Sequence, residues 1–245
     1  LSKTRKVPLV AVPHGLASSQ EVFSRFKKIG RFLERWAYEK PACVVALSPN
    51  DVKRIKELSD KIRVQLIITG ADFAYSKGNA ERIRKKLNLE KNKVTILSTG
   101  RLMAVKGLNY LVDAASRLKG DFQILLFGQG PQEKALKNQV AAAKLEDKVK
   151  FLGFDFRYEA DLLAYSDIFV LPSLSEGLPV GLWRALVAGK PCVVSDIGLP
   201  IEHGKTGLVV PPGDADALAS ALQSLIDSKK LRRRIAKNGQ QFVSQ

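Results

Sequence analysis

The chain has 245 residues, of which 45% are hydrophobic, so it has enough apolar content for a buried core. Its formal net charge is +16, and residues 1–100 carry 21 Lys/Arg against 9 Asp/Glu, which predicts attraction to an anionic partner such as lipid or a nucleotide. The sequence has no apolar run of the about 20 residues that a membrane span needs, no metal-ligand spacing and no nucleic-acid-binding frame.

The first part of the chain predicts short strands separated by helices. Strands are expected at Val7–Val12, Cys43–Leu47 and Arg63–Ile68, and a helix is expected to begin with Ser48 as its N-cap. Val12 is followed by Pro13-His14-Gly15. Two cysteines, Cys43 and Cys192, fall inside predicted strands, which favours buried free thiols in a cytoplasmic protein.

The stretch Gln20–Lys40 predicts a basic amphipathic helix. Its apolar side chains recur with helical spacing and share one face, namely Val22, Phe23, Phe26, Ile29, Leu33, Trp36 and Ala37. Two interpretations remain open. The helix either lies on an anionic membrane surface, making the protein peripheral to the inner face of the membrane, or packs this face on the neighbouring sheet.

From Lys93 onward, strands and helices alternate, which predicts parallel pairing and a doubly wound α/β sheet. The expected strands are Val94–Ser98, Phe122–Phe127, Val149–Leu152, Ile168–Leu171, Cys192–Ser195 and Leu208–Val210. The expected helices are Leu108–Leu118, Pro131–Lys144, Glu159–Tyr165, Val180–Ala188 and one capped by Asp214, and a very basic helix, Asn79–Leu89, is expected just before this region. A basic segment, Lys229–Lys237, follows.

Loops after three of these strands carry candidate phosphate- and nucleotide-binding residues. The first reads Thr99-Gly100-Arg101-Leu102 and continues to Lys106-Gly107. An Arg guanidinium donates two parallel hydrogen bonds to phosphate oxygens, and Lys adds a positive charge. Glycine lets the backbone come close to the phosphate. Gly128-Gln129-Gly130-Pro131 is expected to act mainly as a structural turn, and Phe151-Leu152-Gly153-Phe154 ends the next strand.

The stretch Tyr165–Asp196 contains Glu176-Gly177-Leu178-Pro179, then Arg184-Ala185-Leu186 and Gly189-Lys190-Pro191. It resembles the donor-site signature of GT-B retaining glycosyltransferases, glycosyltransferase family 4 (group 1), in which a second Glu stands eight residues after the first. Here that second position is Arg184. The resemblance also covers the loops with Gly100, Arg101, Lys106 and Gly128.

The resemblance implies transfer of a sugar, hexosyl in type, from a UDP- or GDP-linked donor to a glycan or lipid-linked acceptor, without a metal or cofactor. Glu176 and His14 would be the catalytic residues. The donor would be bound by Gly100, Arg101, Lys106, Gly128, Phe151, Leu152, Glu176, Gly177, Leu178, Pro179 and Arg184. The family's second Glu accepts hydrogen bonds from ribose hydroxyls, which a guanidinium cannot do.

The resemblance further implies a Rossmann-like donor domain over residues 93–245, a linker helix over 79–92 and an N-terminally truncated, incomplete acceptor-side α/β domain over 1–78. Because of Arg184 and the incomplete domain, this chain is expected to be weakly active. The alternative is a non-catalytic nucleotide-sugar-binding subunit, or half of a split transferase completed by a partner chain.

Overall fold

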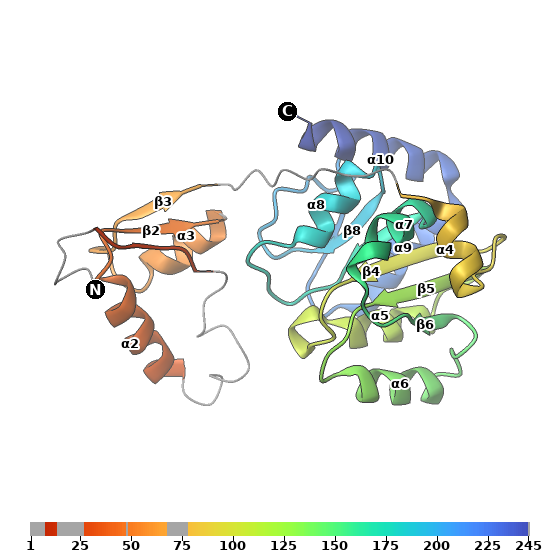
Figure 1. Ribbon diagram of the computed structural model, residues 1–245, viewed down its shortest axis with the longest axis horizontal. Helices are drawn as coiled ribbons and strands as arrows, with labels where there is room; N and C mark the ends of the chain where they lie inside the picture. The colour runs from red at the N-terminus through yellow and green to blue at the C-terminus, as the bar shows by residue number, and fades with distance from the viewer. Residues whose placement is uncertain (1–7, 14–26, 48, 68–77, 245) are drawn as a thin grey trace. The chain divides into compact units, whose positions relative to one another are not determined.

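The computed structural model describes residues 8–13, 27–47, 49–67 and 78–244 (Figure 1). The chain forms two compact units, one of Leu1–Asp72 with Ser175–Pro179, the other of Phe73–Leu174 with Val180–Gln245. The predicted boundaries at residues 78 and 92 stay a prediction. In the part of the chain that the structure describes, no helix is long and apolar enough to cross a membrane.

The first unit contains a small parallel sheet with the strand order β1-β2-β3. Its elements are β1 Val10–Ala11, α2 Lys27–Tyr38, β2 Cys43–Ala46, α3 Pro49–Lys56 and β3 Val64–Leu66. A few buried side chains, chiefly Val44, Ala46, Ile55 and Ile62, form its core. All three strands were expected from the sequence, and each is shorter in the structure than the range expected for it.

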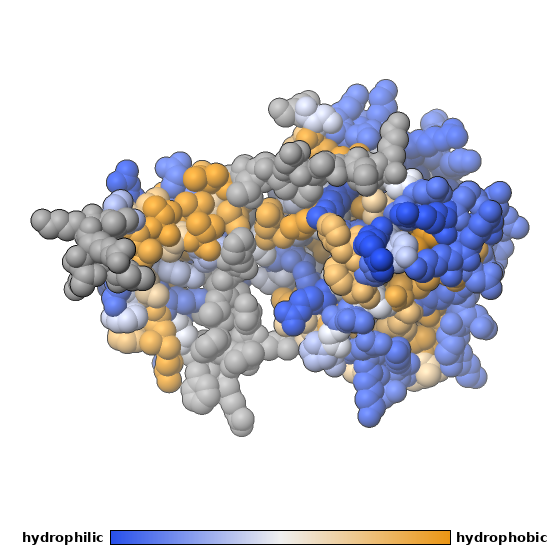
Figure 2. Space-filling view, in the orientation of Figure 1, coloured by the Kyte–Doolittle hydropathy of each residue, from blue (hydrophilic) through white to orange (hydrophobic). Residues whose placement is uncertain are grey.

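The α2 helix does not pack with the face that the sequence marked as apolar. Ile29, Leu33 and Trp36 are 55%, 49% and 56% exposed, and Phe32 is 67% exposed. Gly30 and Glu34 are buried instead. The packed-helix interpretation is therefore wrong for the described apolar residues of this helix, because their side chains are exposed and do not pack on the neighbouring sheet. Figure 2 shows apolar residues on the surface of this unit.

The second unit contains a sheet of six parallel strands in the order β6-β5-β4-β7-β8-β9. The strands are β4 Val94–Thr99, β5 Phe122–Phe127, β6 Val149–Phe151, β7 Ile168–Leu171, β8 Cys192–Ser195 and β9 Leu208–Val210. Strands β5 and β6 are added on one side of β4, and β7, β8 and β9 are added on the other side. The order therefore reverses between β4 and β7, which confirms the doubly wound α/β fold and defines its switch point.

Helices cover both faces of this sheet. They are α4 Ala80–Leu87, α5 Leu108–Ala115, α6 Glu133–Ala142, α7 Glu159–Tyr165, α8 Val180–Val187, α9 Ala215–Asp227 and α10 Lys229–Val243, with short 3-10 turns η3 Ala104–Lys106 and η4 Phe156–Tyr158. Helix α10 extends past the basic segment predicted from the sequence. Its Gly239 disfavours a helix, but packing against the domain outweighs that preference.

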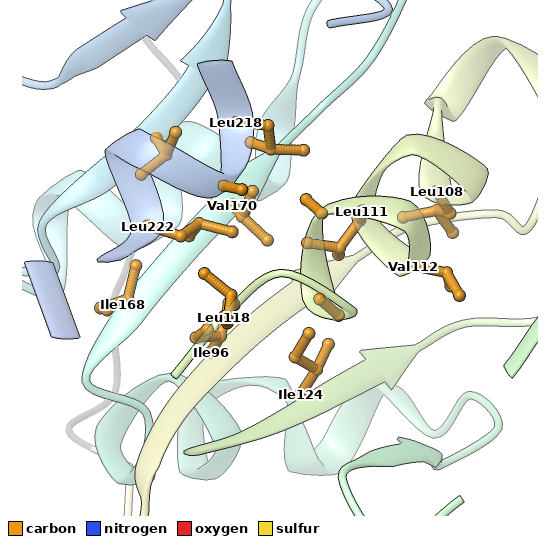
Figure 3. Close-up of a cluster of buried hydrophobic side chains, with 14 of the residues drawn as sticks. Ile96, Leu108, Leu111, Val112, Leu118, Ile124, Ile168, Val170, Leu218 and Leu222 are labelled. Atoms are coloured by element: carbon orange, nitrogen blue, oxygen red, sulfur yellow. The ribbon is translucent and has the colours of Figure 1, made fainter. Parts of the chain in front are cut away.

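Alternate residues of each central strand enter different cores. Ile96, Ile124 and Ile168 pack with α5 and α9 on one face, as Figure 3 shows, whereas Leu97, Leu125 and Phe169 pack with α7 and α8 on the other. Because both faces are covered, the strands read in sequence as nearly continuous apolar runs. This two-sided burial holds the carboxyl ends of β4 and β7 next to each other.

Helix α4 is anchored to the second unit through a buried acid. Ile83 is fully buried in the core that contains α7 and α8. The Asp161 carboxylate, with a side chain 3% exposed, accepts hydrogen bonds from the Asn79 backbone N–H and from Arg82 Nε, both at 2.6 Å. These bonds satisfy a carboxylate that would otherwise be costly to bury, so α4 is fixed to this unit.

Candidate functional site

A pocket opens at the switch point, between the carboxyl ends of β4 and β7. Its walls come from the end of β4 and the loop that follows, and from the end of β7. The lining residues are Ser98, Thr99, Gly100, Arg101, Leu102, Lys106, Leu108, Leu171, Pro172 and Ser173. In an open α/β sheet this is the place where ligands bind. The structure thus brings the predicted residues Gly100, Arg101 and Lys106 together at one pocket.

The loop after β4 is held in shape by its glycines. Gly100 has φ +136°, and a side chain at that position would lie 3.8 Å from Lys106 Cε. Gly107 has φ +61°, and its added Cβ would lie 2.1 Å from the Pro172 carbonyl oxygen. A residue with a side chain would force the β4 and β7 loops apart. Arg101 is exposed and Lys106 is half-buried, so both cations border the pocket at the solvent edge.

The turn after β5 packs directly on the β4 loop. An added Cβ at Gly128 would lie 1.8 Å from the Gly100 carbonyl oxygen, and the Gly100 N–H donates to the Phe127 carbonyl at 3.0 Å. The Leu102 N–H donates to the Gln129 carbonyl at 3.0 Å. The turn at Gly128 therefore packs on the pocket loop, and the part that Gly128 plays in donor binding stays a prediction.

The end of β6 adjoins the same turn. Gly153 forms an isolated bridge with Gly128, and the Leu152 N–H donates to the Leu126 carbonyl at 2.9 Å. Phe151 and Leu152 are half-buried. Beyond them Phe154 is 55% exposed, with its ring centroid 5.3 Å from that of Phe127. The ends of β4, β5 and β6 thus form one continuous rim.

The start of α8 reaches the pocket from the β7 side. An added Cβ at Gly181 would lie 2.4 Å from Thr99 Oγ1, so the first turn of α8 packs closely on the end of β4. The exposed N–H groups of a first helical turn favour an anion nearby. Glu176, Gly177 and Leu178 lie in the loop before α8 and are half-buried, and Pro179 is buried.

Arg184, the residue at the position of the family's second Glu, is engaged within the second unit. Its guanidinium forms an ion pair with the Glu159 carboxylate, at the first residue of α7. It also lies over the Phe156 ring, 5.2 Å from the centroid. The Glu159 side chain is 11% exposed, and burial raises the pKa of its carboxyl group while the attraction of Arg184 opposes that rise.

Several predictions from the sequence fall outside the described residues. These are His14, the first part of the Gln20–Lys40 helix and the Ser48 N-cap. Conversely, the sequence analysis did not predict that Glu159 and Phe156 contact Arg184. An acid in the first turn of a helix is common, so only the unusual Arg184 could have signalled that a compensating acid was needed.

The fold is a doubly wound α/β sheet with a glycine-shaped, cationic pocket at its switch point, which is where such sheets bind their ligands. A family model described as "Glycosyl transferases group 1" matches residues 79–242. The chain therefore belongs to the group 1 glycosyltransferases, and its fold is the GT-B type found in its structural neighbours.

Two curated relatives illustrate the match. Alpha-D-kanosaminyltransferase of Streptomyces kanamyceticus is 29% identical over 256 residues, covering 97% of this chain and 66% of that protein. The amylovoran biosynthesis glycosyltransferase AmsK of Erwinia amylovora is 42% identical over 143 residues, covering 53% of this chain and 35% of that protein. The chain spans two thirds or less of the length of these relatives.

Solved structures agree with this assignment. Anabaena HepE in complex with UDP and glucose has a TM-score of 0.88 and 25% identity, covering 99% of this chain and 68% of that one. Sucrose-phosphate synthase from Thermosynechococcus elongatus has a TM-score of 0.85 and 27% identity, covering 96% and 62%. The chain is similar to both throughout nearly all of its length.

Proposed function

We propose that this chain binds a UDP- or GDP-linked sugar at the switch-point pocket and is a family 4 glycosyltransferase that transfers the sugar with retention of configuration. The observation that carries the proposal is the convergence of Gly100, Arg101 and Lys106 at one pocket. Arg101 and Lys106 would bind the diphosphate as charge-assisted donors. Glu176 and the following Gly177-Leu178-Pro179 would bind the sugar hydroxyls, with Phe151 and Leu152 beside the base. Glu176 and His14 are the proposed catalytic residues.

The proposed acceptor is a glycan or a lipid-linked saccharide, and the proposed location is cytoplasmic, at the inner face of the membrane. Support comes from the names of relatives. One is a UDP-Gal:alpha-D-GlcNAc-diphosphoundecaprenol alpha-1,3-galactosyltransferase of Escherichia coli, 29% identical over 237 residues. Another is the lipopolysaccharide core biosynthesis glycosyltransferase LpsE of Rhizobium meliloti, 26% identical over 225 residues. Neither donor binding nor transfer in this proposal requires a metal or cofactor.

The proposal predicts donor binding with little turnover by this chain, because Arg184 stands where the family has a ribose-binding carboxylate. Arg184→Glu alone would place two carboxylates together, since Glu159 contacts this position. The informative variant is Arg184→Glu combined with Glu159→Gln, which restores the acid and removes the repulsion. We expect a gain in nucleoside-diphosphate affinity and in donor hydrolysis.

The measurement is hydrolysis and transfer with several nucleotide sugars, for the unmodified chain, the double variant and Glu159→Gln as the matched control. Rapid turnover by the unmodified chain would contradict the weak-activity prediction. Absence of any nucleoside-diphosphate binding by the unmodified chain and the double variant would contradict the donor-binding proposal itself.

A second candidate function is half of a split transferase, or a nucleotide-sugar-binding subunit, completed by a partner chain. The observation that favours it is the exposed apolar surface of the first unit, where Leu9, Val10 and Val12 are 50%, 53% and 46% exposed beside a core of few side chains. Strands of so small a sheet rarely form an independently stable core. A partner chain would cover this surface.

Helix α2 offers a direct test of whether lipid covers part of that surface. If it lies on an anionic membrane, Trp36 should enter an apolar environment when vesicles are added. In a Trp183→Phe variant, Trp36 is the remaining tryptophan. The substitution breaks no hydrogen bond of the Trp183 side chain to the described residues, because the buried Nε1 has no partner among them. We expect the Trp36 fluorescence to shift to the blue with anionic vesicles and not with neutral ones, and to return with added salt.

The control is Phe32→Ala with Trp183→Phe, which removes the most exposed apolar residue of α2. It should weaken vesicle binding by tenfold or more, because a buried aromatic side chain contributes about 1.5–3 kcal/mol. An emission spectrum that ignores lipid charge would exclude the membrane interpretation of α2 and favour the partner chain.

A further inference from the structure

Helix α10 has two chemically opposite faces. Its inner face packs on the second unit, where Ile235 is fully buried and an added Cβ at Gly239 would lie 2.8 Å from Leu186 Cδ2 and 2.9 Å from the Thr206 carbonyl oxygen. Opposite this face lie Lys230, Arg233, Arg234 and Lys237, all exposed. Their spacing of i, i+3, i+4 and i+7 places them on one side of the helix. We call these four residues the α10 stripe.

The α10 helix is held rigidly, so the stripe has a fixed direction. Ser228 caps its start by accepting a hydrogen bond from the Leu231 N–H at 3.1 Å. Arg232, on another side, donates to the Ile226 carbonyl at 3.0 Å and so caps α9. Near the other end, Gln240 Nε2 donates to the Val187 carbonyl at 2.9 Å. In Figure 2, hydrophilic side chains cover the outer side of α10, at the upper right.

The stripe differs from the equally basic helix α4. On α4, Arg82 pairs with Asp161, Arg84 pairs with Glu81, and Lys86 lies 3.9 Å from the centre of the Tyr158 ring. Among the described residues, none of the four stripe cations has an ion pair or a hydrogen bond from its side chain. Helix α10 contains no Asp or Glu either. Like charges placed so closely repel one another, and a polyanionic partner would relieve that repulsion.

We propose that the α10 stripe is a second, electrostatic contact with an anionic lipid surface, independent of α2 and of donor binding. The seven residue steps from Lys230 to Lys237 span about 10 Å along the helix, and the stripe presents its cations in one row to a headgroup layer. Polybasic segments bind anionic bilayers in this way without inserting apolar side chains. A single-stranded nucleic acid would need exposed aromatic side chains on which to stack, and the one aromatic residue of α10, Phe242, is half-buried.

The test replaces all four stripe residues by glutamine, which retains the side-chain length and the helix propensity. Binding is measured by co-sedimentation with phosphatidylglycerol-rich vesicles and with pure phosphatidylcholine vesicles. Because each surface cation contributes about fivefold to the partition coefficient, we expect a loss of on the order of 100-fold or more on the anionic vesicles. The unmodified chain should bind the neutral vesicles weakly and lose its anionic-vesicle binding with added salt.

The matched control removes the same charge from other exposed positions of the second unit, with Lys119, Lys134, Lys137 and Lys205 changed to glutamine. It should bind anionic vesicles within a few-fold of the unmodified chain. An equal loss in this control would overturn the proposal, because net charge and not the stripe would then explain binding. Unchanged binding of the stripe variant, or no binding by the unmodified chain, would also overturn it.

Two further arms separate the stripe from other sites. A duplex DNA and an RNA oligonucleotide serve as polyanions without lipid. If either one binds the unmodified chain more tightly than anionic vesicles do, and the stripe variant loses this binding, the stripe is a nucleic-acid surface and the lipid proposal is overturned. UDP affinity should be equal for the stripe variant and the unmodified chain. If UDP binding fails in both while vesicle binding still depends on the stripe, the proposed donor site is wrong and the α10 proposal stands.

Discussion

Replacing Arg184 by alanine is expected to lower the free energy of unfolding by about 2–4 kcal/mol. The reason is that the Glu159 carboxylate, with a side chain 11% exposed, would lose the guanidinium that compensates its burial. Truncation would also remove the contact of Arg184 with the Phe156 ring. Chemical denaturation of the unmodified chain and of the variant measures the difference.

The matched control is Arg157→Ala. Arg157 pairs with Asp155 close by in sequence, but its side chain is 78% exposed. An exposed pair of this kind contributes roughly 0–1 kcal/mol, so the control should change stability little. Adding Glu159→Gln to Arg184→Ala should restore a large part of the loss, because the buried charge is then gone. An Arg184→Ala loss no larger than that of Arg157→Ala would contradict the structural role given to this ion pair.

The stability loss should depend on pH with a defined sign. The pKa of Glu159 is raised in the folded chain by burial, so the folded state binds more protons than the unfolded state above the ordinary pKa. Its ionisation therefore lowers stability as pH rises through the raised pKa. Removing Arg184 removes the attraction that opposes this rise, so the Arg184→Ala defect should be smallest in acid and grow toward neutral pH.

The fold of the second unit could be predicted from sequence because each central strand is buried on both faces. The runs Phe122–Phe127, Ile168–Leu171 and Cys192–Ser195 match the observed strands residue for residue. Their parallel pairing follows from the alternation with helices, whereas the strand order is known from the structure. The pocket loop could be predicted as well, because Gly100 and Gly107 adopt backbone conformations that other residues rarely adopt.

The features that the sequence did not predict depend on contacts between separate elements. The Arg184–Glu159 pair joins α8 to α7, and neither residue indicates its partner by local pattern. The periodicity of α2 identifies its apolar face but not what that face contacts, and Ile29, Leu33 and Trp36 are exposed in the structure. The length of α10 depends on Gly239 fitting against Leu186, a tertiary contact that outweighs the low helix propensity of glycine.

The second prediction with a large effect concerns the diphosphate of the donor. Arg101→Ala and Lys106→Ala should each weaken the binding of UDP or GDP by tenfold or more, since a charge-assisted hydrogen bond contributes roughly 1.5–3 kcal/mol. Both side chains border the same pocket. The double variant should lose on the order of 100-fold if the two contacts are independent.

Calorimetric titration of UDP and GDP into the unmodified chain, Lys106→Ala and the control Lys119→Ala tests the central claim most directly. Lys119 is exposed and does not line the pocket, so its loss removes the same charge without touching the proposed site. The account predicts that affinity falls at least tenfold for Lys106→Ala and remains unchanged for Lys119→Ala. Equal affinity of the unmodified chain and Lys106→Ala would contradict the assignment of the switch-point pocket as the donor site.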